Sequence, residues 1–215
     1  MSPKISRIGL FDRARWPDAF VGGALCLDFC NTVESRGAGR FVDRLLSYTA
    51  LLRWSVAANS AALNTAQKLS ALARRQPAAA DHVAAEAGRM REELYRLFST
   101  IEARDDSSVL VRSVNARLAE LPALPSLKCS RTHGFAYALP GRKLSEPLWP
   151  VLWSTAALLT SSDIDRLGHC HAPPCRYLFV DFSRNGSRRW CSSASCGNRQ
   201  RVRRAYLLVR SRAGT

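Results

Sequence analysis

The feature that most limits what this chain can fold into is a set of four cysteines near its C-terminal end. Cys170, Cys175, Cys191 and Cys196 follow the pattern C-x4-C-x15-C-x4-C. Two cysteine pairs separated by a loop can place four thiolates around one tetrahedral zinc ion. Disulfides are the competing explanation, but we expect a cytoplasmic chain without an export signal, where thiols are kept reduced. The spacing therefore predicts one structural zinc ion.

The four sulfurs would fill the coordination sphere of that ion. His169 and His171 flank the first cysteine, so a mixed ligand set and a catalytic metal are the alternatives. A catalytic zinc keeps one position open for water and has a proton-transfer group nearby. Asp181 is the single acid in residues 169–215, where a turn-capping role suits it. We therefore expect a structural ion and no enzymatic activity.

The segment around the cysteines has few large apolar residues, so its folding should depend on the metal. Its pattern predicts a strand over 175–182, a turn with Asn185-Gly186 at its tip and a return strand over 188–191. Asn198 is placed to cap a helix over 199–210. This order of elements is typical of a treble-clef-like or knuckle-type zinc module that ends in a basic helix.

The chain is strongly basic, and its charge is concentrated beside the cysteines. The formal net charge is +15 at pH 7 and the pI is about 10.4, and residues 169–215 hold ten arginines against one acid. This imbalance indicates a polyanionic partner, the alternative being an arginine-rich tail that serves only solubility. One side of the predicted helix, with Val202, Ala205, Tyr206 and Val209, is expected to pack on the zinc module or the preceding domain. The arginines assigned to nucleic acid are Arg188, Arg189, Arg199, Arg201, Arg203 and Arg204.

Upstream of residue 169 the spacing of apolar residues is mainly helical. The predicted elements, in chain order, are a helix that Asp43 caps and that includes Val56, helices over 61–76, 77–104 and 107–121, a hairpin within 127–139, and helices over 150–159 and 162–167. The fold class is therefore mainly α with a small β element. We predict two domains, a helical one over 1–168 and the zinc module over 169–215.

Two parts of the sequence resemble a known bacterial family. The run Arg188-Arg189-Trp190-Cys191-Ser192, followed by Cys196-Gly197-Asn198-Arg199, is similar to the signature of the CGNR zinc finger. The run from Gly22 to Thr32 is similar to the opening of the ABATE domain, which habitually precedes that finger. The resemblance implies a stress-induced transcription regulator. Its finger would ligate zinc through the four cysteines and bind DNA, and its N-terminal domain has been proposed to sense a ligand.

The ABATE-like opening supplies the candidate ligand-binding residues. Asp28, Asn31 and Thr32 form a polar cluster at the end of an apolar stretch, and Trp54 could line a pocket. Capping, internal hydrogen bonding and core packing are the alternatives for these side chains.

Two further cysteines, Cys26 and Cys30, stand in the same opening, where the family usually has apolar residues. They are either small buried residues or a thiol-reactive pair that senses oxidation.

The leading hypothesis is a DNA-binding transcription regulator with a helical domain that senses a small-molecule effector. An RNA-binding or ribosome-associated protein would make similar phosphate contacts, and a zinc-stabilised protein-interaction module is the third alternative. No apolar run approaches the roughly 20 residues that a membrane span needs, so no membrane partner is expected. A homodimer is compatible with this hypothesis.

Overall fold

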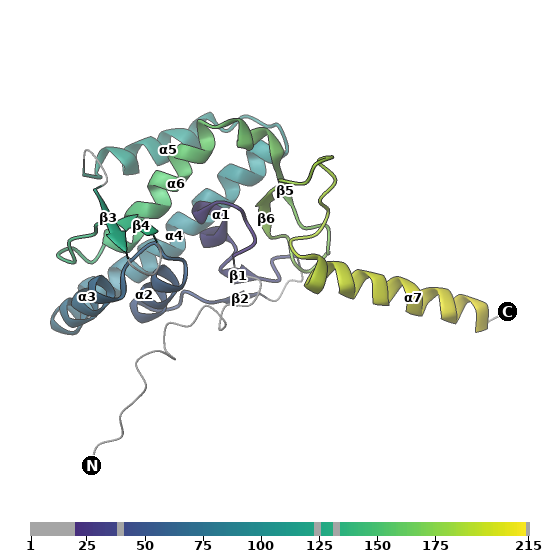
Figure 1. Cartoon of the computed structure of the whole chain (residues 1–215), viewed down its shortest axis with the longest axis horizontal. Coiled ribbons are helices and arrows are strands. Elements are labelled where there is room, and N and C mark those ends of the chain that lie inside the picture. The colour runs from purple at the N-terminus through teal and green to yellow at the C-terminus, as the bar shows by residue number, and fades with distance from the viewer. Residues whose placement is uncertain (1–19, 38–40, 123–125, 131–133, 214–215) are drawn as a thin grey trace, which may run out of the picture.

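The computed structural model describes residues 20–37, 41–122, 126–130 and 134–213. Within these residues the chain is mainly helical, with three small antiparallel sheets of two strands each, which confirms the predicted fold class. Figure 1 shows a helical body and a final helix, α7 (Asn198–Ala213), that extends away from it. No helix in this part of the chain is long and apolar enough to cross a membrane.

The body is organised around α4 (Pro77–Glu102), with Pro77 in its first turn, as predicted. Its buried stripe of Met90, Leu94, Leu97 and Phe98 follows the three- and four-residue spacing of one helix face. The helices that α4 contacts are α1 (Leu25–Cys30), α2 (Tyr48–Ala57), α3 (Leu63–Arg75) and α5 (Ser108–Ala119).

The elements between residues 61 and 167 lie close to their predicted positions. Besides α3, α4 and α5, they are the hairpin of β3 (Leu127–Ser130) and β4 (Gly134–Tyr137), α6 (Trp149–Leu159) and the short helix η3 (Ser162–Arg166). The short helix η2 (Glu146–Leu148), directly before α6, was not predicted.

The predicted helix cap at Asp43 is wrong. Asp43 ends β2 (Val42–Asp43), which pairs with β1 (Val33–Glu34), and the cap of α2 is Ser47, whose Oγ accepts a hydrogen bond from Ala50 N. The Asp43 carboxylate instead accepts two hydrogen bonds of 2.7 Å from the buried guanidinium of Arg91. A buried cation needs such a partner, and this long-range demand outweighs the local capping preference.

The predicted hairpin between 175–182 and 188–191 is also wrong. The strand β6 (Leu178–Val180) pairs with β5 (Leu167–His169), and residues 188–191 form no strand. Leu178 and Val180 are buried in the main core, because β6 packs against α1 and α4. The chain after β6 is held by Asp181, whose carboxylate accepts hydrogen bonds from the backbone of Ser183 and Arg188.

The third sheet also joins the two predicted domains. The boundary predicted between residues 168 and 169 lies inside β5, and β6 on the other side of it completes the core of the helical body. The zinc module therefore rests directly on the N-terminal helices.

Candidate metal centre and nucleic-acid interface

The four cysteines come from two segments of the chain, one directly after β5 and one directly before α7. Cys170 follows β5, and its N–H donates to Tyr177 O, while the N–H of Cys175 donates to Ala172 O. Cys191 ends the loop after β6, and Cys196 lies in a wide helical turn, η4 (Ser193–Gly197), that continues into α7.

The predicted cap at Asn198 is wrong, because Asn198 is itself the first residue of α7 and not the residue before it. Ser192 Oγ accepts a hydrogen bond from Ser195 N at the start of η4, and Asn198 already has helical backbone angles. Consequently α7 is continuous with the turn that carries a cysteine.

The arrangement of the sulfurs fits a tetrahedral zinc ion. All four ligand atoms lie within 4.8 Å of one another, and the sulfurs of Cys175 and Cys191 are 3.6 Å apart. Zinc bonds of about 2.3 Å in a tetrahedron require sulfurs about 3.8 Å apart, whereas a disulfide would bring two of them to about 2.0 Å. All four cysteines are free and buried. The module is therefore a structural zinc site for one ion.

The surroundings favour a thiolate, the metal-binding form, at Cys170, whereas the hydrogen bonds that Cys175 and Cys191 make to that sulfur raise the pKa of both. Hydrogen bonds from the thiols of Cys175 and Cys191 lower the pKa of Cys170. Arg199 donates from its guanidinium to Cys196 Sγ at 3.0 Å, and this bond raises the pKa of Arg199. A guanidinium against a thiolate offsets part of the negative charge that four sulfurs bring to one zinc ion.

The module has a very small core of its own. Ala172, Tyr177 and Phe179 are buried with the cysteines, and Val21 and Trp190 pack at the edge. Phe182, which follows β6 closely, has 57% of its surface exposed. Gly197 packs closely against Trp190, because a Cβ there would lie 3.1 Å from the ring. Such a core cannot fold without the metal.

The flanking histidines lie outside the sulfur cluster. His169 Nδ1 is 3.0 Å from a carboxylate oxygen of Glu102 in α4, and its Nε2 is 2.9 Å from the guanidinium of Arg176. The His171 ring packs near Trp190. Asp181 has the turn-holding role predicted for it, and its hydrogen bonds lower its pKa.

Arg188 is used inside the protein. Its guanidinium donates to the carbonyl oxygens of Val180, Val21, Trp190 and Cys191 and lies 4.1 Å from the centre of the Phe179 ring. These bonds join the zinc loops to the segment that precedes α1. Most of its donors are therefore committed to the fold.

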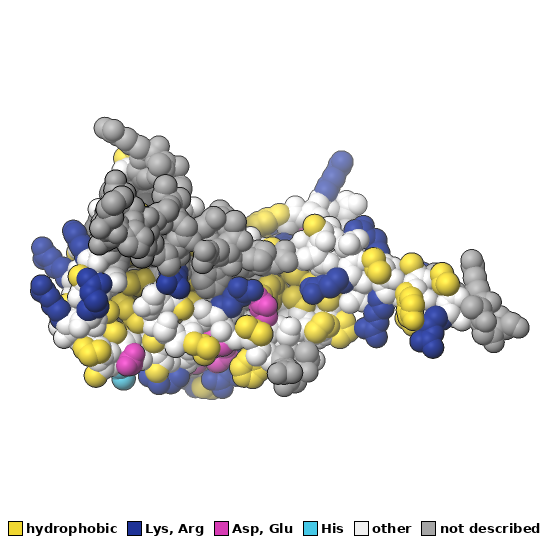
Figure 2. All heavy atoms as spheres, turned by 90° about the horizontal axis from the view of Figure 1, so that it is seen from below, with side chains coloured by type: hydrophobic (Ala, Val, Ile, Leu, Met, Phe, Trp, Pro, Cys, Tyr) yellow, Lys and Arg dark blue, Asp and Glu magenta, His cyan; other side chains and the backbone are white. Residues whose placement is uncertain are grey.

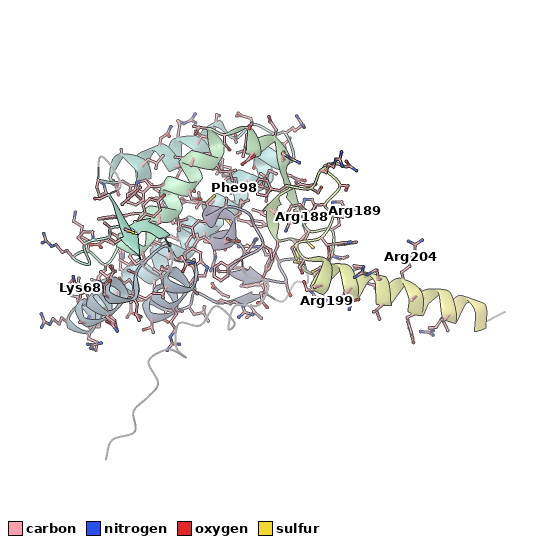
Figure 3. The ribbon with its side chains drawn as sticks, viewed as in Figure 1. Lys68, Phe98, Arg188, Arg189, Arg199 and Arg204 are labelled. Atoms are coloured by element: carbon pink, nitrogen blue, oxygen red, sulfur yellow. The ribbon has the colours of Figure 1, made fainter. Side chains whose placement is uncertain are left out.

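The other assigned arginines lie on the surface around the start of α7. Arg189 is exposed beside Trp190, and Arg201 donates to Ser193 O. Arg203 and Arg204 are exposed further along the helix. Figure 3 shows Arg204 pointing from α7 into solvent, Arg199 at the start of the helix, and Arg188 and Arg189 in the loop beside it. The structure thus separates Arg188 from the five arginines that face outward.

The apolar side of α7 does not pack on the protein, so that expectation was wrong. Val202, Tyr206 and Val209 are each at least 60% exposed, and Leu207 is 56% exposed. Figure 2 shows hydrophobic and basic side chains next to one another on the projecting helix. The body does not cover α7. In the described chain, η4 is the element with which α7 makes more than marginal contact.

The four candidate ligand residues are engaged in internal contacts. The side-chain amide of Asn31 donates to Leu178 O and accepts from Leu178 N, both at 2.9 Å. Thr32 Oγ1 donates to Phe29 O, and Asp28 accepts from Gly22 N. Trp54 is fully buried, and its ring centre lies 5.2 Å from that of Phe29. None of these four residues lines the cavity described below.

Cys26 and Cys30 are completely buried. Burial raises the pKa of Cys26 to about 12 and that of Cys30 well above its ordinary value. Both thiols therefore stay protonated at neutral pH, which is the unreactive form.

The sequence interpretation missed a partly buried network of charges beside α1, with the buried Arg91 at its centre. Arg91 pairs with Asp43 and Glu92, and Glu92 also pairs with Arg36, whose guanidinium donates to Cys30 O. Position 91 lies three residues before Leu94 on the apolar face of α4. A charged residue in that register was the signal that could have revealed the network.

The fold and the site define a zinc protein in which a helical domain carries a four-cysteine module and a basic terminal helix. Comparison with family models gives two matches. Residues 23–162 match ABATE, described as "Putative stress-induced transcription regulator", and residues 166–207 match the CGNR zinc finger. Because the first match covers more than half of the chain, the chain belongs to the ABATE family, with a CGNR zinc finger at its end. A search of the curated proteins found no match.

Proposed function

We propose that this protein is a DNA-binding transcription regulator in which zinc fixes the base of α7. The observation that supports this most is the combination of a metal-anchored helix start with exposed arginines and no acidic residue in α7. Arginine suits this role because its planar fork binds phosphate through two hydrogen bonds. A helix that stands clear of the body can enter a groove of the duplex without steric conflict.

The arginines divide into two roles in this proposal. Arg189, Arg201, Arg203 and Arg204 contact phosphates or bases from the surface. Arg199 supports the zinc site through Cys196 while remaining close to the same surface. Arg188 contributes by holding the loops together, and it makes no direct contact with nucleic acid.

The test is binding to duplexes selected from a random pool, measured by fluorescence anisotropy at several salt concentrations. Replacing Arg203 and Arg204 together by alanine should lower the salt slope by about two, because each lost phosphate contact removes about one unit. Arg75→Ala, at an exposed arginine near the end of α3, is the matched control and should bind like the wild type. Unchanged affinity and slope in the double variant would overturn the proposal.

The exposed apolar side chains of α7 favour a second candidate, a protein-interaction module or homodimer interface. Val202, Tyr206 and Val209 lie on one side of the helix, where a partner could cover them. Replacing Val202 and Tyr206 by serine should then reduce association measured by sedimentation, while DNA binding by the monomer is retained. Structured RNA in competition with the selected duplex tests the RNA-binding alternative.

The remaining parts of the proposal concern the whole chain. We assign it a cytoplasmic location, in keeping with four free thiols that bind metal. A non-enzymatic role is supported by the filled zinc sphere, which leaves no position for a water molecule. The helical domain would sense a small-molecule effector.

A further inference from the structure

A cavity of about 680 Å³ opens between α4 and the segment around β1 and β2. Its apolar lining comes from Val33, Phe41 and Gly88, and its charged lining includes Arg36 and Arg96. Small-molecule sites usually occupy about 300–1,000 Å³ and are mostly apolar with a few polar groups. This cavity has that size, and it combines an apolar surface with charged groups at its wall.

Gly88 is the unusual residue of the lining. It lies in the interior of α4, where glycine is among the least favourable residues for a helix. A Cβ at this position would meet nothing within 4 Å, so close packing does not require glycine. Its missing side chain instead leaves the wall of the cavity open. A functional role of this kind can explain a glycine within a helix.

The charged groups of the lining leave a positive excess. The carboxylate of Glu92 is paired with Arg36 and Arg91, and that of Glu93 with Arg117. Arg96 is exposed and forms no ion pair with a carboxylate in the described part of the chain. Among the described atoms, Arg36 Nε is also buried without a hydrogen-bond acceptor. A ligand oxygen would satisfy such a donor.

The wall of the cavity continues directly into the first zinc loop. The residue after Arg36 is Gly37, whose N–H donates to Pro174 O between the first two cysteines. A Cβ at Gly37 would lie 1.9 Å from Pro173 O, so the two backbones are in close contact. The Arg36 guanidinium also lies 3.9 Å from the centre of the Tyr95 ring, and Tyr95 Oη donates to Arg176 O.

We infer that this cavity binds an amphipathic organic acid. Its apolar body lies against Val33, Phe41 and Gly88, and its carboxylate pairs with Arg96, within reach of Arg36. Binding moves the Arg36–Gly37 segment and thereby the loop between Cys170 and Cys175. The binding site and the loop movement stand without the proposed function, whereas their use as a signal for DNA binding rests on it.

The experiment uses the zinc-loaded full chain and three probes, 1-naphthoate, decanoate and the uncharged 1-naphthalenemethanol, in calorimetric titrations. Gly88→Leu fills the wall without a clash at Cβ, and leucine is a better helix former, so the variant should fold. At least one acid should bind with a Kd below about 1 mM. Its affinity should fall about 10-fold or more in Gly88→Leu and in Arg96→Gln, while Arg75→Gln leaves it unchanged. The alcohol should bind independently of Arg96.

Two results would overturn the site: no acid binding below about 1 mM, or equal affinity in Gly88→Leu and the wild type. The coupling is measured separately, as hydrogen exchange over residues 170–176 with and without the bound acid. Unchanged exchange would overturn the coupling and leave the site intact. A chain that binds the acid but no duplex would overturn the proposed function alone.

Discussion

Replacing Asn31 by leucine should destabilise the whole protein, although Asn31 lies far in sequence from the zinc module. Its side chain makes two hydrogen bonds of 2.9 Å to the backbone of Leu178, one as donor and one as acceptor. Both residues are almost completely buried. Asn31 therefore acts as a neighbouring strand would, covering the outer edge of β6.

The size of the effect follows from the two groups left behind. Leucine has the same number and branching of side-chain heavy atoms as asparagine, so the substitution opens no empty space, but the N–H and C=O of Leu178 lose their partners. Each buried unsatisfied group costs about 1–3 kcal/mol, which gives a loss of about 2–6 kcal/mol. Single domains have about 5–15 kcal/mol in total, so the variant should be marginal.

The assay is urea unfolding of the zinc-loaded chain, followed by tryptophan fluorescence and circular dichroism. Asn115→Leu, at an exposed asparagine of α5, is the control and should change the free energy of unfolding by less than about 0.5 kcal/mol. A loss in Asn31→Leu as small as that of the control would refute the role given to Asn31 as the cover of β6.

The packing of β6 on the helical body also affects how stable that body is without the zinc module. The fragment 1–168 should still unfold cooperatively, because most of the core lies within it. It should nevertheless be less stable than the full chain, since it lacks Leu178 and Val180, and about 1.5–3 kcal/mol is lost for each buried side chain of this size. A fragment melt without a cooperative transition, or one as stable as the full chain, would contradict this description.

Three further outcomes follow from the structure. Elemental analysis should find one zinc ion per chain. Cys191→Ser should lose the ion together with the fold of the module, because the small core depends on the metal. A native chain without metal would contradict this. Arg188→Ala should destabilise the chain by about 2–4 kcal/mol, because it leaves buried carbonyls unpaired. Arg189→Ala should leave stability unchanged and weaken DNA binding. Equal melting temperatures of the two variants would refute the different roles given to Arg188 and Arg189. At pH 8 the native chain should react with iodoacetamide at the exposed Cys129 and not at Cys26. Because the pKa of Cys26 is raised from 9.0 to about 12, its contribution to stability is present below pH 9 and falls as the pH rises towards 12, which pH-dependent unfolding can measure.

Residues close together in sequence were sufficient to predict the metal centre. The spacing of Cys170, Cys175, Cys191 and Cys196 predicts zinc because ligand geometry depends on short loops and on the chemistry of sulfur. Likewise, the apolar period of α4 and the proline in its first turn are local signals, and the helix lies where they place it.

Only the tertiary structure decided which partners the remaining residues found. β6 pairs with β5 because Leu178 and Val180 complete a core to which α1 and α4, far earlier in the chain, contribute. Arg188 looks like Arg189 in the sequence, yet one is bonded to four carbonyls and the other faces solvent. A side chain's role depends on whether its donors and acceptors meet buried partners or water, and the long-range packing of the chain determines which of the two they meet.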